Sequence, residues 1–262
     1  MNLRTPGEVA AIDRAATLAC EVLETLIARA CAGVATRDLD WLARGLIADA
    51  GAEALFPLER NARGEAFPGA VSISINDEIL NGVPGDRVIS AGDLVTVDLG
   101  LRLDGWCADL ARSVVVEGGA KDRAELIELA EGMASRAAGA VRAGRRWGVI
   151  ADEAAAWARG QGVSVIAGFA GHGIGRHLHE QPLVAFRSSR GGSVTGTRDD
   201  FELRAGMVLP IEPLVAAGEG AWVEDGDGWT VRTADGSVAA GVEWMIAVEE
   251  GGGRRLGRTG GA

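Results

Sequence analysis

Apolar residues recur every three to four positions along the first fifty residues, which is the spacing of an amphipathic helix. Thr5 is a capping residue, Pro6 suits the first helical position and Glu8 completes a capping box, so we expect a helix to begin here. Its apolar positions are Val9, Ile12, Ala16, Cys20, Leu23 and Ile27. Thr36 is expected to open a second helix that stops at Gly51.

From Phe67 onward the apolar period changes to two, and short β-branched runs predict strands at 71–75, 94–99 and 113–116. Turn sequences such as Asn81-Gly82 separate these runs. Helical spacing returns over about 121–141 and 149–159. Further strand-like runs follow at 163–166, 207–211 and 242–248.

Helices followed by strands occur twice along the chain, which hints at two similar halves. This order favours an α+β fold with antiparallel sheet and helices on one side over strict alternation of strand and helix. We expect a single domain over residues 1–250. The Gly-rich end, 251–262, carries Arg254, Arg255 and Arg258 and is expected to be a flexible tail.

Composition describes a soluble globular protein: 262 residues, 47% hydrophobic and 24% charged. The net charge of −11 argues against a nucleic-acid partner. Cys20, Cys31 and Cys107 form no CxxC motif, which favours a reducing compartment. No secretory leader and no apolar run of membrane-spanning length is found, so we expect a cytoplasmic protein without a membrane partner. The oligomeric state is left open, with a monomer favoured.

All three histidines fall within eight residues, in the glycine-rich segment Gly171-His-Gly-Ile-Gly-Arg-His-Leu-His179. Histidine titrates near neutral pH and is the commonest metal-ligating side chain. A cluster of this kind in a chain with no other histidine predicts a functional site.

Four acids interrupt apolar, strand-like runs, where a lone ionised carboxylate would be costly to bury. They are Asp98, Asp109, Glu212 and Glu243. Together with one imidazole they suggest a shared cation site. Such an oxygen-rich set without sulfur suits Mn²⁺, Fe²⁺ or Co²⁺ better than Zn²⁺. Four anions exceed what one ion needs, so two ions bridged by carboxylates are expected, an arrangement that can activate water.

Two other sites remain open at this point. His172, His177 and His179 could form a mononuclear zinc site with an open water position, although this leaves the four acids unexplained. The glycine run also suggests a phosphate-binding loop, but it lacks the G-x-G-x-x-G spacing.

The residues described above resemble the methionine aminopeptidase family of the short bacterial type, over about residues 3–250. The similarity is carried by Asp98 and Asp109 eleven apart, the Gly171–Gly175 segment with His179, Ile211-Glu212-Pro213, and Glu243 in the last strand. The resemblance implies a pita-bread fold, a pseudo-two-fold antiparallel sheet with helices on its outer face. It also implies a dinuclear metal centre held by Asp98, Asp109, His172, Glu212 and Glu243.

The same resemblance implies the roles of the remaining site residues. Glu212 would also take a proton from the nucleophilic water, and His179 would hydrogen-bond the substrate carbonyl and the developing oxyanion. The pocket for the N-terminal side chain would be lined by Phe67, Ser72, Leu178 and Trp229.

The chain departs from the family at one catalytic position. Asn81 stands where the family has a histidine that contacts the scissile amide, and asparagine cannot transfer a proton near neutral pH. Loss of an acid–base group costs on the order of 10²- to 10⁴-fold in rate. The chain also has no tyrosine, so aromatic residues that the family tends to use upstream of Phe67 are missing, and Gly64 is among their replacements. Trp244 follows the last ligand, where the family usually has a smaller polar residue or a histidine.

We therefore expect a metal-dependent aminopeptidase that removes a Met-type N-terminal residue, with reduced activity or a changed substrate preference. The alternatives are a hydrolase of the same fold acting on Xaa-Pro or small non-peptide amides, and a non-catalytic metal-binding relative.

Overall fold

Four α-helices dominate the computed structural model, which describes residues 2–257. They are α1 (Pro6–Arg29), α2 (Thr36–Asp49), α3 (Lys121–Ala140) and α4 (Trp147–Gly160). A one-turn 3₁₀ helix, η1 (Phe56–Leu58), follows α2. The predicted capping box is present: the Glu8 amide donates to the Thr5 hydroxyl, and the Glu8 carboxylate accepts from the Thr5 amide. All four helices predicted from the apolar period are confirmed.

Strands fill the space between the helices. They are β1 (Glu53–Ala54), β2 (Ser72–Ile75), β3 (Glu78–Leu80), β4 (Leu94–Leu103), β5 (Trp106–Val115), β6 (Ser164–Val165), β7 (Gly171–Gly173), β8 (Glu180–Val184), β9 (Val208–Ile211), β10 (Leu214–Ala216), β11 (Trp222–Glu224), β12 (Val231–Thr233), β13 (Ala239–Gly241), β14 (Trp244–Val248) and β15 (Gly253–Arg255). Every strand pairing among the described residues is antiparallel, as predicted for an α+β fold. The strands pair as five small sheets, of which the four-stranded one contains β1, β2, β4 and β5.

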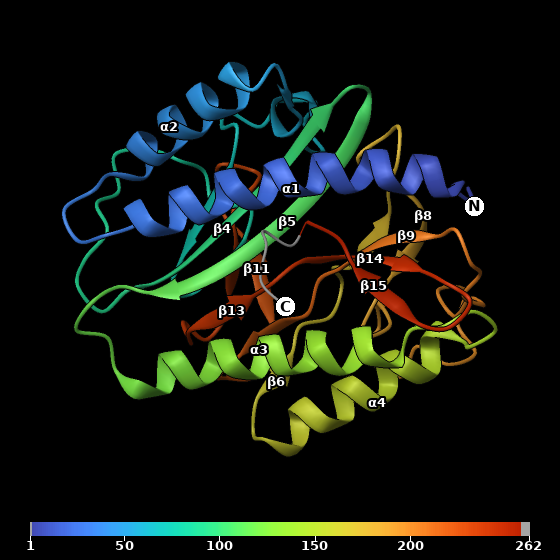
Figure 1. Ribbon diagram of the computed structural model, residues 1–262. Helices are drawn as coiled ribbons and strands as arrows, with labels where there is room; N and C mark the ends of the chain where they lie inside the picture. The colour runs from blue at the N-terminus through green and yellow to red at the C-terminus, as the bar shows by residue number, and fades with distance from the viewer. Residues whose placement is uncertain (1, 258–262) are drawn as a thin grey trace.

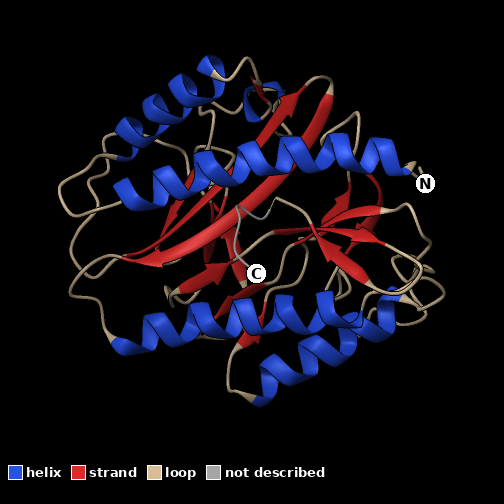
Figure 2. Ribbon diagram, viewed as in Figure 1, coloured by secondary structure: helices blue, strands red, loops and turns tan. Residues whose placement is uncertain are grey.

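The helices lie in two pairs with the strands between them. Figure 1 shows α1 and α2 along one side of the strands and α3 and α4 along the opposite side. The secondary-structure colouring of Figure 2 shows that the long β4–β5 hairpin lies under α1. The site described below is formed where the strands of the two halves meet.

Each helix pair covers its own hydrophobic core. The first core joins α1 and α2 to β4 and β5, and the second joins α3 and α4 to β9 and β14. Fully buried alanines, Ala15, Ala16 and Ala19, form the inner face of α1, and their small side chains allow the helix to lie close to the sheet. Among the described residues, no helix is both long enough and apolar enough to cross a membrane.

The chain end differs from the flexible tail predicted from Gly251. Gly253–Arg255 forms strand β15, which pairs with β14, and the next residue, Leu256, is buried. The Gly257 amide also donates to the Asp13 carboxylate. The prediction is wrong for these residues because glycine content alone does not reveal a pairing partner on another strand. The rest of the predicted tail, 258–262, lies outside the described residues.

Candidate active site

A two-residue turn brings Asp98 and Asp109 together on one hairpin. Leu103 pairs with Trp106, and the two residues between them have positive φ angles, 51° at Asp104 and 76° at Gly105. Asp-Gly in this conformation is the preferred tight hairpin turn. The resulting register pairs Asp98 with Ala111, so both carboxylates lie on the same face of the sheet as diagonal neighbours.

The second half of the molecule supplies the other two acids and a histidine. Glu212 directly follows β9, Glu243 directly precedes β14, and His172 is the middle residue of β7. Glu243 also joins the two halves, because its amide donates to the Ala111 carbonyl at 2.9 Å. Gly171 lets β7 approach β9 closely: a Cβ at this position would lie 2.2 Å from the Pro210 carbonyl oxygen.

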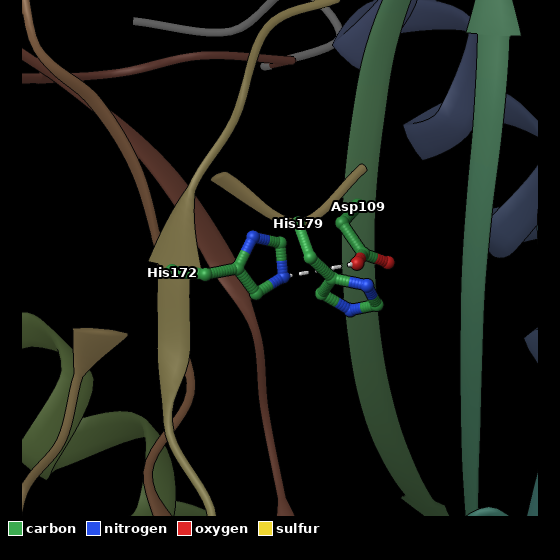
Figure 3. A group of neighbouring side chains, drawn as sticks. All are labelled: Asp109, His172 and His179. Carbon is green, nitrogen blue, oxygen red and sulfur yellow. Dashed lines mark ion pairs between the residues drawn. The ribbon is translucent and has the colours of Figure 1, made fainter. Parts of the chain in front are cut away.

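These five side chains converge on one cavity of about 270 Å³. The cavity is lined by Phe56, Glu59, Phe67, Leu80, Asn81, Asp98, Asp109, Phe169, Ala170, His172, His179, Glu212, Trp229 and Glu243. The His172 Nε2 atom lies 3.4 Å from Asp109 Oδ2 and 4.0 Å from Glu243 Oε1. Figure 3 shows the His172, His179 and Asp109 side chains turned toward one another from three different segments.

The cavity disfavours the ionised form of the four acids that line it. Burial raises the pKa of Asp98, Asp109, Glu212 and Glu243 well above the usual range, and repulsion from neighbouring carboxylates raises it further. Oδ1 of Asp98 and Oδ1 of Asp109 are buried without a hydrogen-bond partner. Among the described residues that line the cavity, none is a lysine or arginine. These features fit a bound divalent cation, which would supply the missing positive charge.

The two histidines at the cavity favour their neutral form. Burial lowers the pKa of His172, and burial together with the neighbouring His172 lowers the pKa of His179. A neutral imidazole is the form that binds a metal. The His172 Nδ1 atom lies 3.0 Å from the Gly173 carbonyl oxygen, which leaves Nε2 as the nitrogen toward Asp109.

His177 does not join the other two histidines. Its side chain is exposed and it is absent from the described residues that line the cavity. The three histidines therefore do not converge, and the geometry gives no support to the mononuclear zinc alternative. The glycine run forms β7 and a turn rather than the start of a helix, so it does not form a dinucleotide loop either.

Only part of the predicted substrate shell lines the cavity. Phe67 and Trp229 do, and their rings meet edge to face with centroids 5.2 Å apart. Ser72 is buried and pairs with Asp98 between β2 and β4. Leu178 is buried beside Gly100, where an added Cβ would lie 2.9 Å from the leucine Cδ1 atom. The structure thus places Ser72 and Leu178 behind the lining residues, next to the strand that carries Asp98.

Asn81 lines the cavity from the turn after β3. Its φ angle is 56°, a left-handed conformation that asparagine tolerates well. The next residue, Gly82, leaves no room for a side chain, since its Cβ would lie 2.2 Å from the Ile73 carbonyl oxygen. The backbone therefore holds residue 81 at the cavity wall.

Five residues of the cavity wall were not predicted from the sequence: Phe56, Glu59, Leu80, Phe169 and Ala170. Phe169 lies two residues before Gly171, and its closeness to the histidine segment is a signal that could have identified it. Glu59 gave no comparable signal, because it stands in a polar stretch where a charged side chain is expected to be solvated.

Comparison with known proteins identifies the family of this chain. The model of metallopeptidase family M24 matches residues 10–250. The chain is 34% identical over 257 residues to methionine aminopeptidase from Aquifex aeolicus, covering 96% of each chain. It is 34% identical over 250 residues to the enzyme from Treponema pallidum, covering 95% of this chain and 92% of that one.

Solved structures show the same similarity. Methionine aminopeptidase from Rickettsia prowazekii superposes with a TM-score of 0.89 at 30% identity, covering 98% of this chain and 100% of that one. Prolidase from Pyrococcus furiosus shares the fold, with a TM-score of 0.77 at 22% identity over 99% of this chain and 66% of that one. The expected pita-bread fold is confirmed. The chain belongs to metallopeptidase family M24, and it is similar over nearly its whole length to methionine aminopeptidases.

Proposed function

We propose that this protein is a metal-dependent aminopeptidase that removes a Met-type N-terminal residue from peptides, with activity limited by Asn81. The observation that supports this most directly is the convergence of four carboxyls and His172 on one cavity without a lysine or arginine among its described lining residues. Asp109, Glu243 and His172 are buried, and Asp98 and Glu212 are half-buried. The similarity to methionine aminopeptidases supports the substrate class.

The proposed metal centre contains two divalent ions, with Mn²⁺, Fe²⁺ or Co²⁺ favoured by the oxygen-rich ligand set. Asp98, Asp109, His172, Glu212 and Glu243 would together hold the ions, as the family resemblance implies. When bound, such a pair of ions activates a water molecule and polarises the scissile carbonyl.

The protein's own residues would position the peptide and move the protons. Glu212 would take a proton from the attacking water, the role that the family resemblance implies for it. Phe67 and Trp229 would contact the N-terminal side chain through their aromatic rings. His179 and Asn81 both line the cavity and would contact the scissile peptide group. Asn81 can hydrogen-bond there but cannot transfer a proton.

A binding and turnover experiment tests this function. The purified protein is titrated with Mn²⁺ or Co²⁺ by calorimetry, and the loaded protein is then incubated with a library of peptides that vary at the first two residues. We expect divalent binding and measurable release of N-terminal methionine. Asp109→Asn should lower kcat/KM by about 10²-fold or more, because it removes the charge of a proposed metal ligand.

The matched control is Asp86→Asn, which makes the same change at an exposed aspartate and should leave turnover unchanged. Failure to bind any divalent ion would exclude the hydrolase function. Release confined to peptides with proline at the second position, or to non-peptide amides, would replace the proposed substrate with the alternative one.

A further inference from the structure

Phe169 is an aromatic residue of the cavity wall to which the proposed function gives no role. It reaches the cavity from the segment between β6 and β7, two residues before Gly171. Its side chain packs against a small apolar cluster, as does that of Leu80, another residue of the wall. Phe169 is only half-buried, so part of its ring remains accessible to a bound molecule.

A second aromatic residue, Trp222 of β11, lies against Phe169. The two ring centroids are 4.9 Å apart, and the ring planes are tilted by 53°. Phe169 lines the cavity and Trp222 does not, so the indole lies beyond the cavity wall. Trp222 is 42% exposed. An aromatic surface therefore runs from the cavity wall to the outside of the molecule.

The indole of Trp222 is held in a fixed orientation. Its Nε1 atom donates to the Ala167 carbonyl at 2.9 Å. The ring also lies directly on the backbone of Gly168, where an added Cβ would be 3.3 Å from Cζ2 of the indole. A side chain whose rotation is already restricted loses little conformational entropy when a ligand covers it. Such tryptophans are the residues that contribute most often to binding surfaces.

The sheet that carries Trp222 also reaches the cavity. Strand β12 lies between β11 and β3, and its residue Val231 pairs with Glu224 of β11 and with Leu80 of β3. Neighbouring strands lie about 4.8 Å apart, so β11 is about 10 Å from the part of β3 that lines the cavity. An extended peptide advances about 3.3 Å per residue, so two or three residues after the scissile bond can cover this distance.

We propose that Phe169 and Trp222 form a subsite for an apolar side chain at the third residue of the peptide, outside the pocket for the N-terminal side chain. This inference rests on the proposed function and extends it to the residues that follow the scissile bond. The second residue of the peptide lies beside Phe169, and the third lies on the indole of Trp222. An aromatic third residue is preferred to glycine, because it covers exposed ring surface and adds a contact between rings.

Kinetics with two peptides test this preference. Both peptides begin with methionine and alanine, and they differ only at the third residue, which is phenylalanine or glycine. We expect the wild type to favour phenylalanine by about 3- to 10-fold in kcat/KM. Trp222→Ala should bring this ratio toward one by lowering only the value for the phenylalanine peptide, and Trp222→Phe, which keeps a ring, should retain part of it. The ratio is taken within one preparation, so a partly unfolded variant does not change it.

Trp41→Ala is the matched control. It makes the same substitution at a tryptophan of α2 that is 63% exposed and is absent from the described residues that line the cavity. The preference for phenylalanine should be the same in this variant as in the wild type. A ratio near one in the wild type, an equal ratio in wild type and Trp222→Ala, or an equal loss in Trp41→Ala would overturn the proposal.

Binding without turnover separates this inference from the proposed function. Analogues of both peptides, in which a CH₂–NH group replaces the scissile amide, are titrated into the Mn²⁺-loaded protein by calorimetry. The phenylalanine analogue should bind about 3- to 10-fold more tightly than the glycine analogue, and only in proteins that retain a ring at position 222. If the wild type cleaves neither peptide, the proposed function fails, but this ratio still decides the inference. Binding that phenylalanine does not strengthen would contradict the subsite.

Discussion

Asn81 is the residue at which we propose that this chain departs from the chemistry of its relatives. Histidine, like asparagine, is enriched in the left-handed conformation, so the backbone at φ 56° can accept the change. We expect Asn81→His to raise kcat/KM for Met-peptides by about 10²-fold, the lower end of what a restored acid–base group contributes. Initial rates at saturating Mn²⁺ measure this.

Asn81→Ala serves as the control for that change, since it removes the amide without adding a group that titrates. It should not gain activity. If Asn81→His is no faster than the wild type, the missing histidine is not what limits this protein, and a changed substrate preference becomes the better explanation.

At the level of single residues, the acids of the site could be predicted because each interrupts an apolar run. Asp98 stands between Val97 and Leu99, where a charge without a function would be costly. Glu59 could not be found this way, because only the folded backbone between η1 and Phe67 brings it to the cavity. Ser72 is the opposite case, a predicted pocket residue that does not line the cavity. Its position in the sequence did not reveal that β2 places it behind the lining residues.

The start of α4 depends on a carboxylate from elsewhere in the chain. Asp200 accepts from the Gly148 amide at 3.0 Å, the Gly196 amide at 2.9 Å and Arg146 Nε at 3.0 Å. Burial alone would raise the Asp200 pKa, but these hydrogen bonds outweigh it and lower the pKa. Asp200→Ala should therefore cost about 2 kcal/mol of unfolding free energy at pH 7.

The lowered pKa of Asp200 determines how its contribution to the free energy of unfolding changes with pH. Asp200 contributes its full stability above the pKa of the unfolded chain, whose ordinary value is 3.8, and this contribution is lost as the pH falls through the lower pKa of the folded state. The difference between wild type and Asp200→Ala in urea unfolding should shrink below about pH 4. Glu202→Ala, an exposed acid two residues away, should show no such loss, and an equal cost in both variants would contradict the capping role.

At the level of elements, long periodic segments were predictable and short strands were not. The apolar period of each helix repeats over several turns, so it can be recognised in the sequence without knowledge of the tertiary contacts. Strands such as β7, β10 and β13 have three residues each, too few for a period to show. Their pairing depends on segments far away in the chain, as for Leu214 with Gly241.

Across the whole molecule, the metal site should decide how stability depends on pH. Its four carboxyls have raised pKa values in the folded state, so the native protein without metal holds more protons than the unfolded chain. Stability should then fall as the pH rises from about 5 to 8 in EDTA. Mn²⁺ at about 100 times its Kd should restore about 2.7 kcal/mol. Thermal unfolding across this pH range measures both effects.

Glu243→Gln tests whether the buried acids cause both the loss of stability with pH in EDTA and the stabilisation by Mn²⁺. It removes one buried charge, so the EDTA curve should fall less steeply with pH, and the stabilisation by Mn²⁺ should be smaller. Stability that rises with pH in EDTA would show that these acids are not held at raised pKa values in the folded protein.

The turn that carries His179 depends on the opposite end of the sequence. Glu180 accepts from the Arg176 and His177 amides and forms an ion pair with Arg4, a contact that spans 176 positions. Closing so long a loop costs chain entropy before the contact stabilises anything. We therefore expect the turn to become ordered late in refolding, after both hydrophobic cores have formed, so that pulse-labelled amides at 176 and 177 gain protection after those of α1 and α3. Competence for catalysis would then be the last property that the folding chain acquires.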